Sequence, residues 1–299
     1  MFLNPNLPEV INPFRVTSGI NYTNAAADWA FYDVSALKTV EFNYLVNETT
    51  IEGAILVALP SNQREMGILK YKDFAALKKG TGKPLQRFSI AGVGSSDVGA
   101  AALARTLADY YQEPVGAIVA GYGISDLLQE ALGGWFVLGG VNSAMSFFDL
   151  ALKNPFLNGP SKTEEEKQEK AVDVITEKSP DTETLFNLLL DDKREILSVA
   201  GHSKGCLSIA IALEALTDGK NDDALARAKN IDVVTVGAVV TFPEGFARVR
   251  QFLGSIDWFG GLNSRALEDR ISVPNAWHHL NTSIPYHMDL VEVLKKNQQ

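Results

Sequence analysis

Residues Ile196 to Leu216 read ILSVAGHSKGCLSIAIALEAL, and they decide how the rest of the chain is interpreted. The segment from Arg194 to Gly201 is a short apolar run bounded by charge on one side and by glycine on the other, which predicts a strand. The nearly uncharged run CLSIAIALEAL predicts a buried helix. Residues 201–205, between the two, read GHSKG and match the pattern G-x-S-x-G. The segment therefore predicts a strand, a tight turn that carries a serine, and a helix.

Ser203, the serine of this turn, is a candidate nucleophile. Glycines at positions 201 and 205 would let the strand and the helix approach each other while the serine adopts a sparsely populated backbone conformation. Such a turn raises the hydroxyl above the sheet, and the N-terminus of the helix directs its amides at developing negative charge. The alternative is a glycine-rich turn that binds a phosphate or only packs. We expect Ser203 to act as the nucleophile.

A serine nucleophile needs a base, and the chain has four histidines. His202 adjoins Ser203 and is a poor candidate for the base. Hydrolases with this turn carry their catalytic residues in the chain order Ser, then Asp or Glu, then His, so we expect the base in the C-terminal segment. We favour His287, in the loop before the last predicted helix, and keep His279 and His278 as alternatives.

The acid that orients the base should follow a strand beyond the serine turn. Asp257 fits, because it comes at the end of the apolar run Ala247–Asp257 and glycines follow it. Glu244 and Asp269 are alternatives, and Asp257 could also be an ordinary loop aspartate that caps a turn.

Two groups are candidates for the oxyanion hole. One is the backbone N–H of Lys204, the residue directly after Ser203. The other is Ser95 or a neighbour, because a flexible turn follows the strand-like run RFSIAG at residues 87–92. Together these residues would complete a Ser203, Asp257 and His287 triad.

Strand-like and helix-like runs alternate along the chain, which predicts an α/β protein with a mostly parallel central sheet and helices on both faces. The continuous apolar runs are typical of parallel strands that are covered on both faces. The remaining expected elements are a helix over Ala25–Leu37, a strand pair over Lys38–Val46 and Thr50–Leu59, a helix over Ala100–Gln112, a strand or buried helix over Val115–Gly123, strands over Ile231–Val240 and Ala247–Asp257, and a helix over Asp289–Lys296.

We expect a single domain over residues 1–299, with 115–185 as a candidate lid or insertion. Residues 131–148 carry no charge, which favours a buried helix or an apolar flap over a cleft. A membrane span is the less favoured alternative, because the segment contains four glycines and lacks a flanking basic cluster.

Composition excludes several classes of protein. The chain has 299 residues with 46% hydrophobic and 21% charged residues, as in globular domains with a full core. Its net charge of -9 and the lack of a basic block argue against nucleic-acid binding. Cys206 is the only cysteine, so we expect no intrachain disulfide, no cysteine-based zinc site and a packing role for the thiol. The first residues do not resemble a secretory signal, so we expect a cytoplasmic protein or one exported without a recognisable signal.

The residues that carry these expectations resemble the α/β-hydrolase superfamily, and within it the class 3 (fungal-type) lipases. The resemblance covers about Arg87 to Leu290 and rests on GHSKG at 201–205, on GVGSSD at 92–97, on Asp257 and on a late histidine. That family carries an Arg-Gly-Ser/Thr turn for the oxyanion; Gly94 and Ser95 match it here, and Val93 stands in place of the arginine. Cys206 stands where a further glycine is common.

The resemblance implies a serine hydrolase that cleaves carboxylic esters, lipid-like ones in particular, through an acyl-enzyme and without a metal or organic cofactor. An ester or lipid substrate and a transient contact with a lipid interface would follow, and the oligomeric state is left open. Two other functions fit the same residues: a non-catalytic module of this fold that binds a lipid or a protein, and an acyltransferase that uses the same serine.

Overall fold

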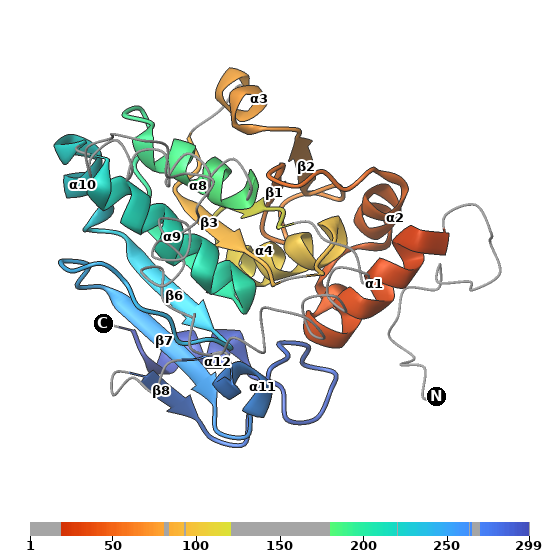
Figure 1. The fold of residues 1–299 in the computed structure, drawn as a ribbon. Helices are drawn as coiled ribbons and strands as arrows, with labels where there is room; N and C mark the ends of the chain where they lie inside the picture. The colour runs from red at the N-terminus through yellow and green to blue at the C-terminus, as the bar shows by residue number, and fades with distance from the viewer. Residues whose placement is uncertain are drawn as a thin grey trace, which may run out of the picture.

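The computed structural model describes residues 19–80, 84–92, 94–120, 180–219, 221–262, 264 and 270–298. Within them, eight strands form one sheet in the order β2-β1-β4-β3-β5-β6-β7-β8 (Figure 1). The strands are β1 (Ile55–Ala58), β2 (Ile68–Tyr71), β3 (Arg87–Ile90), β4 (Val115–Ile118), β5 (Ser198–His202), β6 (Asp232–Val236), β7 (Val249–Gly254) and β8 (Arg270–Val273).

The six strands from β4 to β8 in this order run parallel, and β1 is antiparallel to both of its neighbours, β2 and β4. The helices in the described residues are α1 (Gly19–Phe31), the 3-10 turn η2 (Val34–Ala36), α2 (Thr39–Asn47), α3 (Phe74–Lys79), α4 (Asp97–Tyr111), α8 (Pro180–Leu190), α9 (Lys204–Asp218), α10 (Asp222–Ala228), α11 (Trp258–Leu262) and α12 (Leu290–Lys296).

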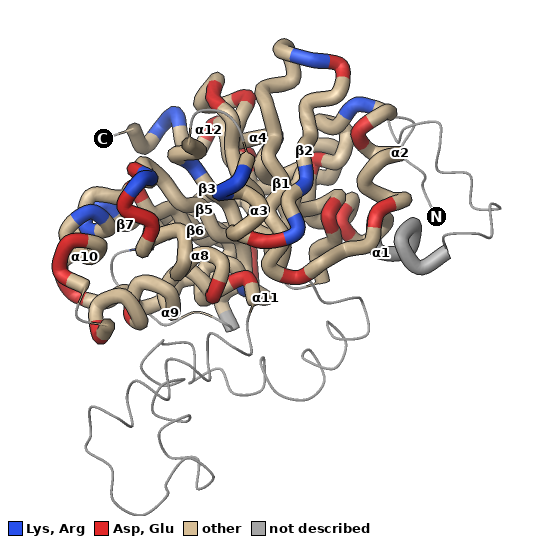
Figure 2. Tube along the Cα trace, turned by 90° about the horizontal axis from the view of Figure 1, so that it is seen from above, with Lys and Arg blue, Asp and Glu red and all other residues tan. Residues whose placement is uncertain are grey.

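Helices cover both faces of the sheet. Figure 2 shows α4 and α12 on one side of the strands, and α8 and α9 on the other. Neighbouring residues of one strand belong to different cores. Ala200 is part of the core that includes residues of α1, α2, α4 and α12, whereas Val199 is part of the core that includes residues of α3, α8, α9 and α10. Because both faces are covered, strands β4 and β5 are buried along their whole length, and β6 is buried after its first residue.

This architecture confirms the predicted fold class, an α/β protein with a mostly parallel sheet and helices on both faces. The expected strands around residues 194–201, 231–240 and 247–257 are present as β5, β6 and β7, and the expected helices around 100–112 and 289–296 are α4 and α12. Parallel strands need long crossover connections, and helices supply them here.

The predicted strand over Lys38–Val46 is wrong, because helix α2 occupies this segment. Its β-branched and aromatic residues favour a strand locally. In the folded chain Phe42, Leu45 and Val46, spaced as neighbours on one helix face, are buried against the core. The expected strand pair is therefore replaced by a pair in which β1 adjoins β2.

Glu41 anchors α2 from inside the protein. Its carboxylate accepts hydrogen bonds from the backbone N–H of Lys38 at 2.9 Å and of Gly67 at 2.7 Å. It also accepts a hydrogen bond from Arg105 Nη2 of α4 at 2.6 Å, and both charged side chains are fully buried. The ion pair thus joins α2, α4 and the chain before β2.

Both ends of the range 115–185, the candidate lid, form regular elements of the α/β core. Val115–Ile118 is strand β4, which lies between β1 and β3, and residues 180–185 begin α8. The lid expectation therefore does not hold for these residues. Residues 121–179, including the uncharged segment 131–148, lie outside the described residues. In the part of the chain that the structure describes, no helix has the length and apolar character that a membrane span requires.

Candidate active site

Ser203 lies between the end of β5 and the start of α9, as the sequence predicts. Its backbone has φ 53° and ψ -119°, in a region that a residue with a side chain rarely adopts. Two backbone hydrogen bonds hold this conformation: Ser203 N–H donates to Val236 O at 2.9 Å, and Cys206 N–H donates to Ser203 O at 3.0 Å. The serine thus sits in a strained turn that its surroundings fix.

The two glycines of GHSKG are needed for close packing. A Cβ on Gly201 would approach Cys206 N to 2.8 Å, and a Cβ on Gly205 would clash with the carbonyl oxygen of Ile90 in β3. The predicted role of these glycines, to let the strand and the helix approach each other, is confirmed. The Cys206 side chain is fully buried, and burial raises the pKa of its thiol to about 12, in keeping with a packing role.

Asp257 follows β7, as expected, but its partner is His278. His278 Nδ1 lies 2.9 Å from Asp257 Oδ2, and both side chains are buried. The other carboxylate oxygen accepts a hydrogen bond from Gly260 N–H at 2.6 Å. A Cβ on Gly260 would approach Asp257 Oδ2 to 2.5 Å, so this turn also needs glycine. The carboxylate is therefore fixed on both of its oxygens.

The imidazole of His278 lies beside the serine turn. Its ring centroid is 4.9 Å from that of His202, the residue before Ser203. A Cβ on Gly237 would lie 3.0 Å from His278 Cε1 and 3.2 Å from His202 Nε2, so both rings cover the backbone at Gly237. Gly237 follows Val236, whose carbonyl oxygen binds Ser203 N–H. The pair of Asp257 and His278 is thus brought to the carboxyl end of β6, next to Ser203.

No hydrogen bond joins Ser203 Oγ to His278 among the interactions of the described residues. The Ser203 side chain keeps part of its surface exposed. Catalytic hydrogen bonds are often long or poorly aligned before substrate binds.

His202 connects the serine turn to the loop that carries His278. Its Nε2 lies 2.8 Å from His278 O, and its Nδ1 lies 2.9 Å from the hydroxyl of Tyr32, just after α1. A carbonyl oxygen can only accept, so His202 Nε2 carries a proton and donates it to His278 O. Nδ1 of the neutral ring therefore accepts the proton of the Tyr32 hydroxyl, which itself accepts a hydrogen bond from Gly92 N–H at 2.6 Å. Burial lowers the pKa of His202 to about 3, so the ring is neutral in this network.

Asp28 of α1 fixes the loop between β3 and α4. Its carboxylate accepts hydrogen bonds from Ser96 N–H at 3.1 Å and from Ser96 Oγ at 2.5 Å. Ser96 is the N-cap of α4, and a Cβ on Gly99 would clash with Asp28. Burial raises the pKa of Asp28 to about 6, although its hydrogen bonds with Ser96 act in the opposite direction. The sequence analysis missed Asp28 and Tyr32, because neither belongs to a recognisable motif.

Ser95 lies in this buried network. Its N–H donates to Gly92 O at 3.2 Å, its hydroxyl donates to Ser96 O at 3.3 Å, and only 3% of its surface is exposed. The Ser95 amide thus donates within its own turn in this structure. The loop passes Ser203 at Gly92 instead, where a Cβ would lie 3.0 Å from Ser203 Cβ. Val93 lies outside the described residues.

Lys204 is the first residue of α9, so its backbone N–H belongs to the N-terminal end of the helix, beside Ser203. Its side chain is buried and turns toward α8, where Nζ lies 3.9 Å from Asp181 Oδ2. Asp181 also accepts a hydrogen bond from Ser208 Oγ at 2.8 Å. The position expected for one oxyanion donor is thus present at the serine turn.

The structure does not pair Asp257 with His287, the base favoured from the sequence. His287 Nδ1 lies 2.8 Å from Ile284 O within its own turn. His279 packs edge-on against Trp277 at 5.4 Å, and burial lowers the pKa of its imidazole. The correct partner is the neighbour His278, because the chain recrosses the end of β7 there: Ile256 N–H donates to Ala276 O at 3.2 Å.

The two alternative acids are not seen beside His278 for different reasons. Glu244 is exposed, and Asp269 lies outside the described residues. Within the described residues no group of three or more His, Cys, Asp or Glu side chains could hold a metal ion. No protein-family model, curated protein or solved structure matches the chain in the three comparisons made with known proteins.

Proposed function

We propose that the chain is a serine hydrolase of the α/β-hydrolase type that cleaves carboxylic esters. The observation that carries the proposal is the buried pair of Asp257 and His278, 2.9 Å apart, beside a serine held at φ 53° between a strand and a helix. The chain order Ser203, Asp257, His278 is the order found in hydrolases that use this turn. His278 takes the place that the sequence analysis gave to His287.

In the proposed reaction, His278 Nε2 takes the proton of Ser203 Oγ while Oγ attacks the ester carbonyl. Asp257 accepts the Nδ1–H of His278, which fixes the tautomer and stabilises the imidazolium. The tetrahedral oxyanion accepts a hydrogen bond from Lys204 N–H at the start of α9. His278 returns the proton to the departing alkoxide, which leaves an acyl group on Ser203.

Water then attacks the acyl-enzyme, and His278 removes one of its protons and returns it to Ser203 Oγ. The products are a carboxylic acid and an alcohol. The hydrogen bond between Ser203 Oγ and His278 Nε2 forms when the serine side chain turns toward the ring in the substrate complex.

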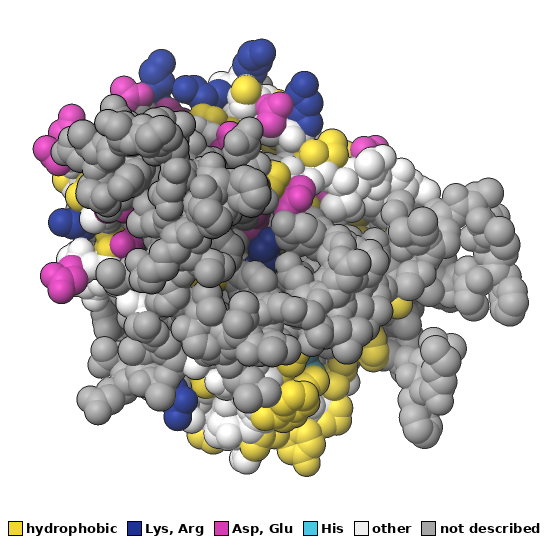
Figure 3. Space-filling model, in the orientation of Figure 1, with side chains coloured by type: hydrophobic (Ala, Val, Ile, Leu, Met, Phe, Trp, Pro, Cys, Tyr) yellow, Lys and Arg dark blue, Asp and Glu magenta, His cyan; other side chains and the backbone are white. Residues whose placement is uncertain are grey.

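An exposed apolar surface supports lipid-like esters as substrates. Ile256 and Trp258, on either side of Asp257, are 45% and 65% exposed, and Tyr286 is 65% exposed. The three positions are close, because Trp277 N–H donates to Tyr286 O at 2.6 Å and Ile256 N–H donates to Ala276 O. Figure 3 shows hydrophobic side chains gathered at the lower end of this face, where α11 and the segment before α12 lie in Figure 1. Exposed apolar patches mark lipid or protein contacts.

The test combines covalent labelling with turnover. A fluorophosphonate probe should label the wild-type chain and the His287→Ala variant, and should fail to label Ser203→Ala. Ester hydrolysis should fall by at least about a hundredfold in His278→Ala, since loss of a general base costs about 10²–10⁴ in rate. Retained activity in His278→Ala would contradict the assignment of the base.

The same assay separates the rival functions. An acyltransferase would label with the probe but transfer the acyl group to an added alcohol in preference to water. A non-catalytic module would not label and would hydrolyse no ester of any chain length. The expected result is labelling together with release of the free acid, with long-chain esters preferred over acetate esters.

A further inference from the structure

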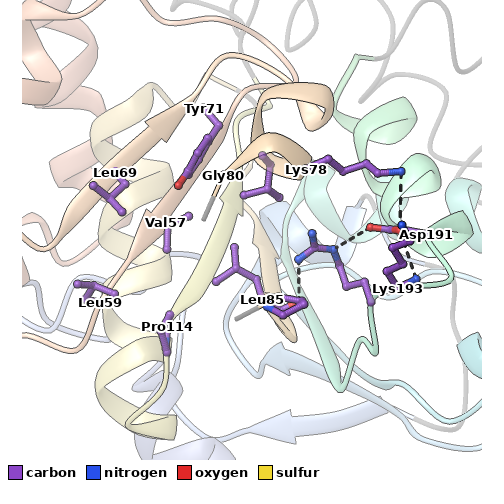
Figure 4. A pocket seen from close by; sticks show the side chains of 13 residues that line it. Val57, Leu59, Leu69, Tyr71, Lys78, Gly80, Leu85, Pro114, Asp191 and Lys193 are labelled. Atoms are coloured by element: carbon purple, nitrogen blue, oxygen red, sulfur yellow. Dashed lines mark hydrogen bonds and ion pairs between the residues drawn. The ribbon is translucent and has the colours of Figure 1, made fainter. Parts of the chain in front are cut away.

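A second candidate binding site lies at the other end of the sheet. A cavity of about 340 Å³ opens where β3, β4 and β5 begin, and Leu85, Pro114 and Arg194 line it just before these strands (Figure 4). Ser203 follows the carboxyl end of β5, so the length of the parallel strands separates the two sites. The volume falls within the range of small-molecule sites, about 300–1,000 Å³.

One wall of the cavity is apolar. It is formed by Val57 of β1 and Leu69 of β2, which are paired across these two strands, together with Leu59. Leu77 of α3 and Leu85 add to the apolar lining. Figure 4 shows Leu69, Val57 and Leu59 on one side of the cavity, and Lys78, Asp191 and Lys193 on the other. Leu69 is 47% exposed, which is unusual for a large apolar side chain on a strand.

The opposite wall carries an excess of positive charge. Lys78, Lys193 and Arg194 line the cavity there with Asp191 as the one carboxylate of the lining. Lys78 Nζ and Arg194 Nε approach the Asp191 oxygens to 3.9 Å and 3.5 Å. The charged residues of the lining therefore have a positive net charge, whereas the whole chain has a net charge of -9. The excess favours an anionic ligand.

Arg194 supplies the strongest argument for a ligand. Only 8% of its surface is exposed, and its guanidinium makes one hydrogen bond in the described structure, from Nη1 to Leu85 O at 3.2 Å. Its Nε is buried and forms an ion pair with Asp191 Oδ2 at 3.5 Å, but it makes no hydrogen bond. A buried guanidinium with unused donors is costly, and a carboxylate is the ligand group that matches its geometry.

We propose that this cavity binds a medium-chain carboxylate. The alkyl chain lies along Val57, Leu59 and Leu69, and the carboxylate faces Arg194, Lys78 and Lys193. An apolar wall and a cationic wall facing each other across one small cavity fit an anionic amphiphile better than a sugar or a nucleotide. The proposal does not depend on Ser203, because the two sites lie at opposite ends of the strands.

The test is calorimetric titration of the full chain with decanoate below its micelle-forming concentration. We expect one decanoate to bind per chain, and 1-decanol and butyrate to bind at least about tenfold more weakly, since each lacks one half of the recognition. Arg194→Gln should weaken decanoate binding by about tenfold or more, as expected for loss of a charge-assisted hydrogen bond. Leu69→Glu places a charge on the apolar wall and should weaken binding at least as much.

Two controls keep the result specific. Val40→Glu alters another exposed apolar residue, 42% exposed and outside the cavity, and should leave the affinity unchanged. Ser203→Ala should also leave it unchanged, so the outcome is separate from the proposed hydrolase activity. Because Leu69 is half-exposed, its variant keeps the test valid even if Arg194→Gln is poorly folded. Absence of decanoate binding, or binding that survives both cavity variants, would overturn the proposal.

Discussion

Replacing Tyr32 by phenylalanine tests how the site is held together. This change removes only the hydroxyl group. Tyr32 is 3% exposed, and its ring keeps its place in the core. The hydroxyl binds Gly92 N–H at 2.6 Å and His202 Nδ1 at 2.9 Å. The change therefore deprives one buried donor and one buried acceptor of their partner at the same time.

The expected cost follows from these two contacts. A buried polar group that loses its partner destabilises the fold by about 1–3 kcal/mol. Taking the smallest value, about 1 kcal/mol, for each of the two groups gives a total of about 2 kcal/mol. We expect Tyr32→Phe to lower the free energy of unfolding by at least about 2 kcal/mol, measured by urea denaturation. His202 is also freed to move, and with it the carbonyl of His278. We therefore expect kcat for ester hydrolysis to fall by at least about tenfold with little change in KM.

Tyr110→Phe is the matched control. Its hydroxyl accepts a hydrogen bond from Gln298 Nε2 at 2.9 Å on the exposed surface, far in the sequence from the serine turn. Water replaces such a partner, so we expect a change within about 0.5 kcal/mol and unaltered turnover. If Tyr32→Phe lost less than about 1 kcal/mol, or lost stability with kcat intact, the network would not position the site as argued.

Three further predictions concern stability. The folded-state pKa of Asp28 is raised to about 6 from 3.8, so the folded state binds the proton more tightly and this group adds stability as pH falls through that window. Asp28→Asn removes the effect, and the difference in unfolding free energy between wild type and variant should grow by about 3 kcal/mol from about pH 7 to about pH 3.5. Arg105→Met leaves the buried Glu41 carboxylate unpaired and should cost about 3–5 kcal/mol in denaturant unfolding, whereas the double variant with Glu41→Leu should cost less than this single change. Gly205→Ala forces a Cβ against the last carbonyl of β3 and should abolish folding or labelling, whereas Gly261→Ala meets open space and should leave the melting temperature unchanged or higher.

The serine turn could be predicted because its signals are local. A strand, a pair of glycines and an apolar helix follow one another within 21 residues, and the structure uses each as expected. The clashes that a Cβ would cause at Gly201 and Gly205 show why these positions are small. Asp257 could be placed for a similar reason, since an aspartate after a parallel strand lies at the same edge of the sheet as the residue after β5.

Helix α2 could not be predicted from the same kind of signal. Residues 38–46 have the composition of a strand, and the interactions that make them a helix come from distant parts of the chain. Arg105 of α4 and Gly67 before β2 both bind Glu41. Tertiary contacts of this kind override local preference, and a single sequence does not show them.

The contact between Asp257 and His278, in place of His287, could not be predicted for a related reason. The loop that carries them follows β8 (Arg270–Val273), a strand that the sequence analysis did not expect. With β8 unrecognised, His287 was favoured because it lies just before the last predicted helix. All three late histidines lie in the loop between β8 and α12, so their position in the chain does not separate them, and only the contact with Asp257 singles out His278.

The directions of the hydrogen bonds explain why one nitrogen in the site is suited to act as the base. Tyr32 gives its only proton to His202 Nδ1, so His202 Nε2 keeps its own proton and donates it to His278 O. His202 therefore has no lone pair left for Ser203, although it is the neighbouring residue. His278 Nδ1 donates to Asp257, which leaves the lone pair of the neutral His278 ring on Nε2. Burial keeps His202 neutral, and the Asp257 carboxylate fixes the tautomer of His278. Tyr32, just after α1, thus helps to set the geometry around Ser203, Asp257 and His278, which come from the second half of the chain.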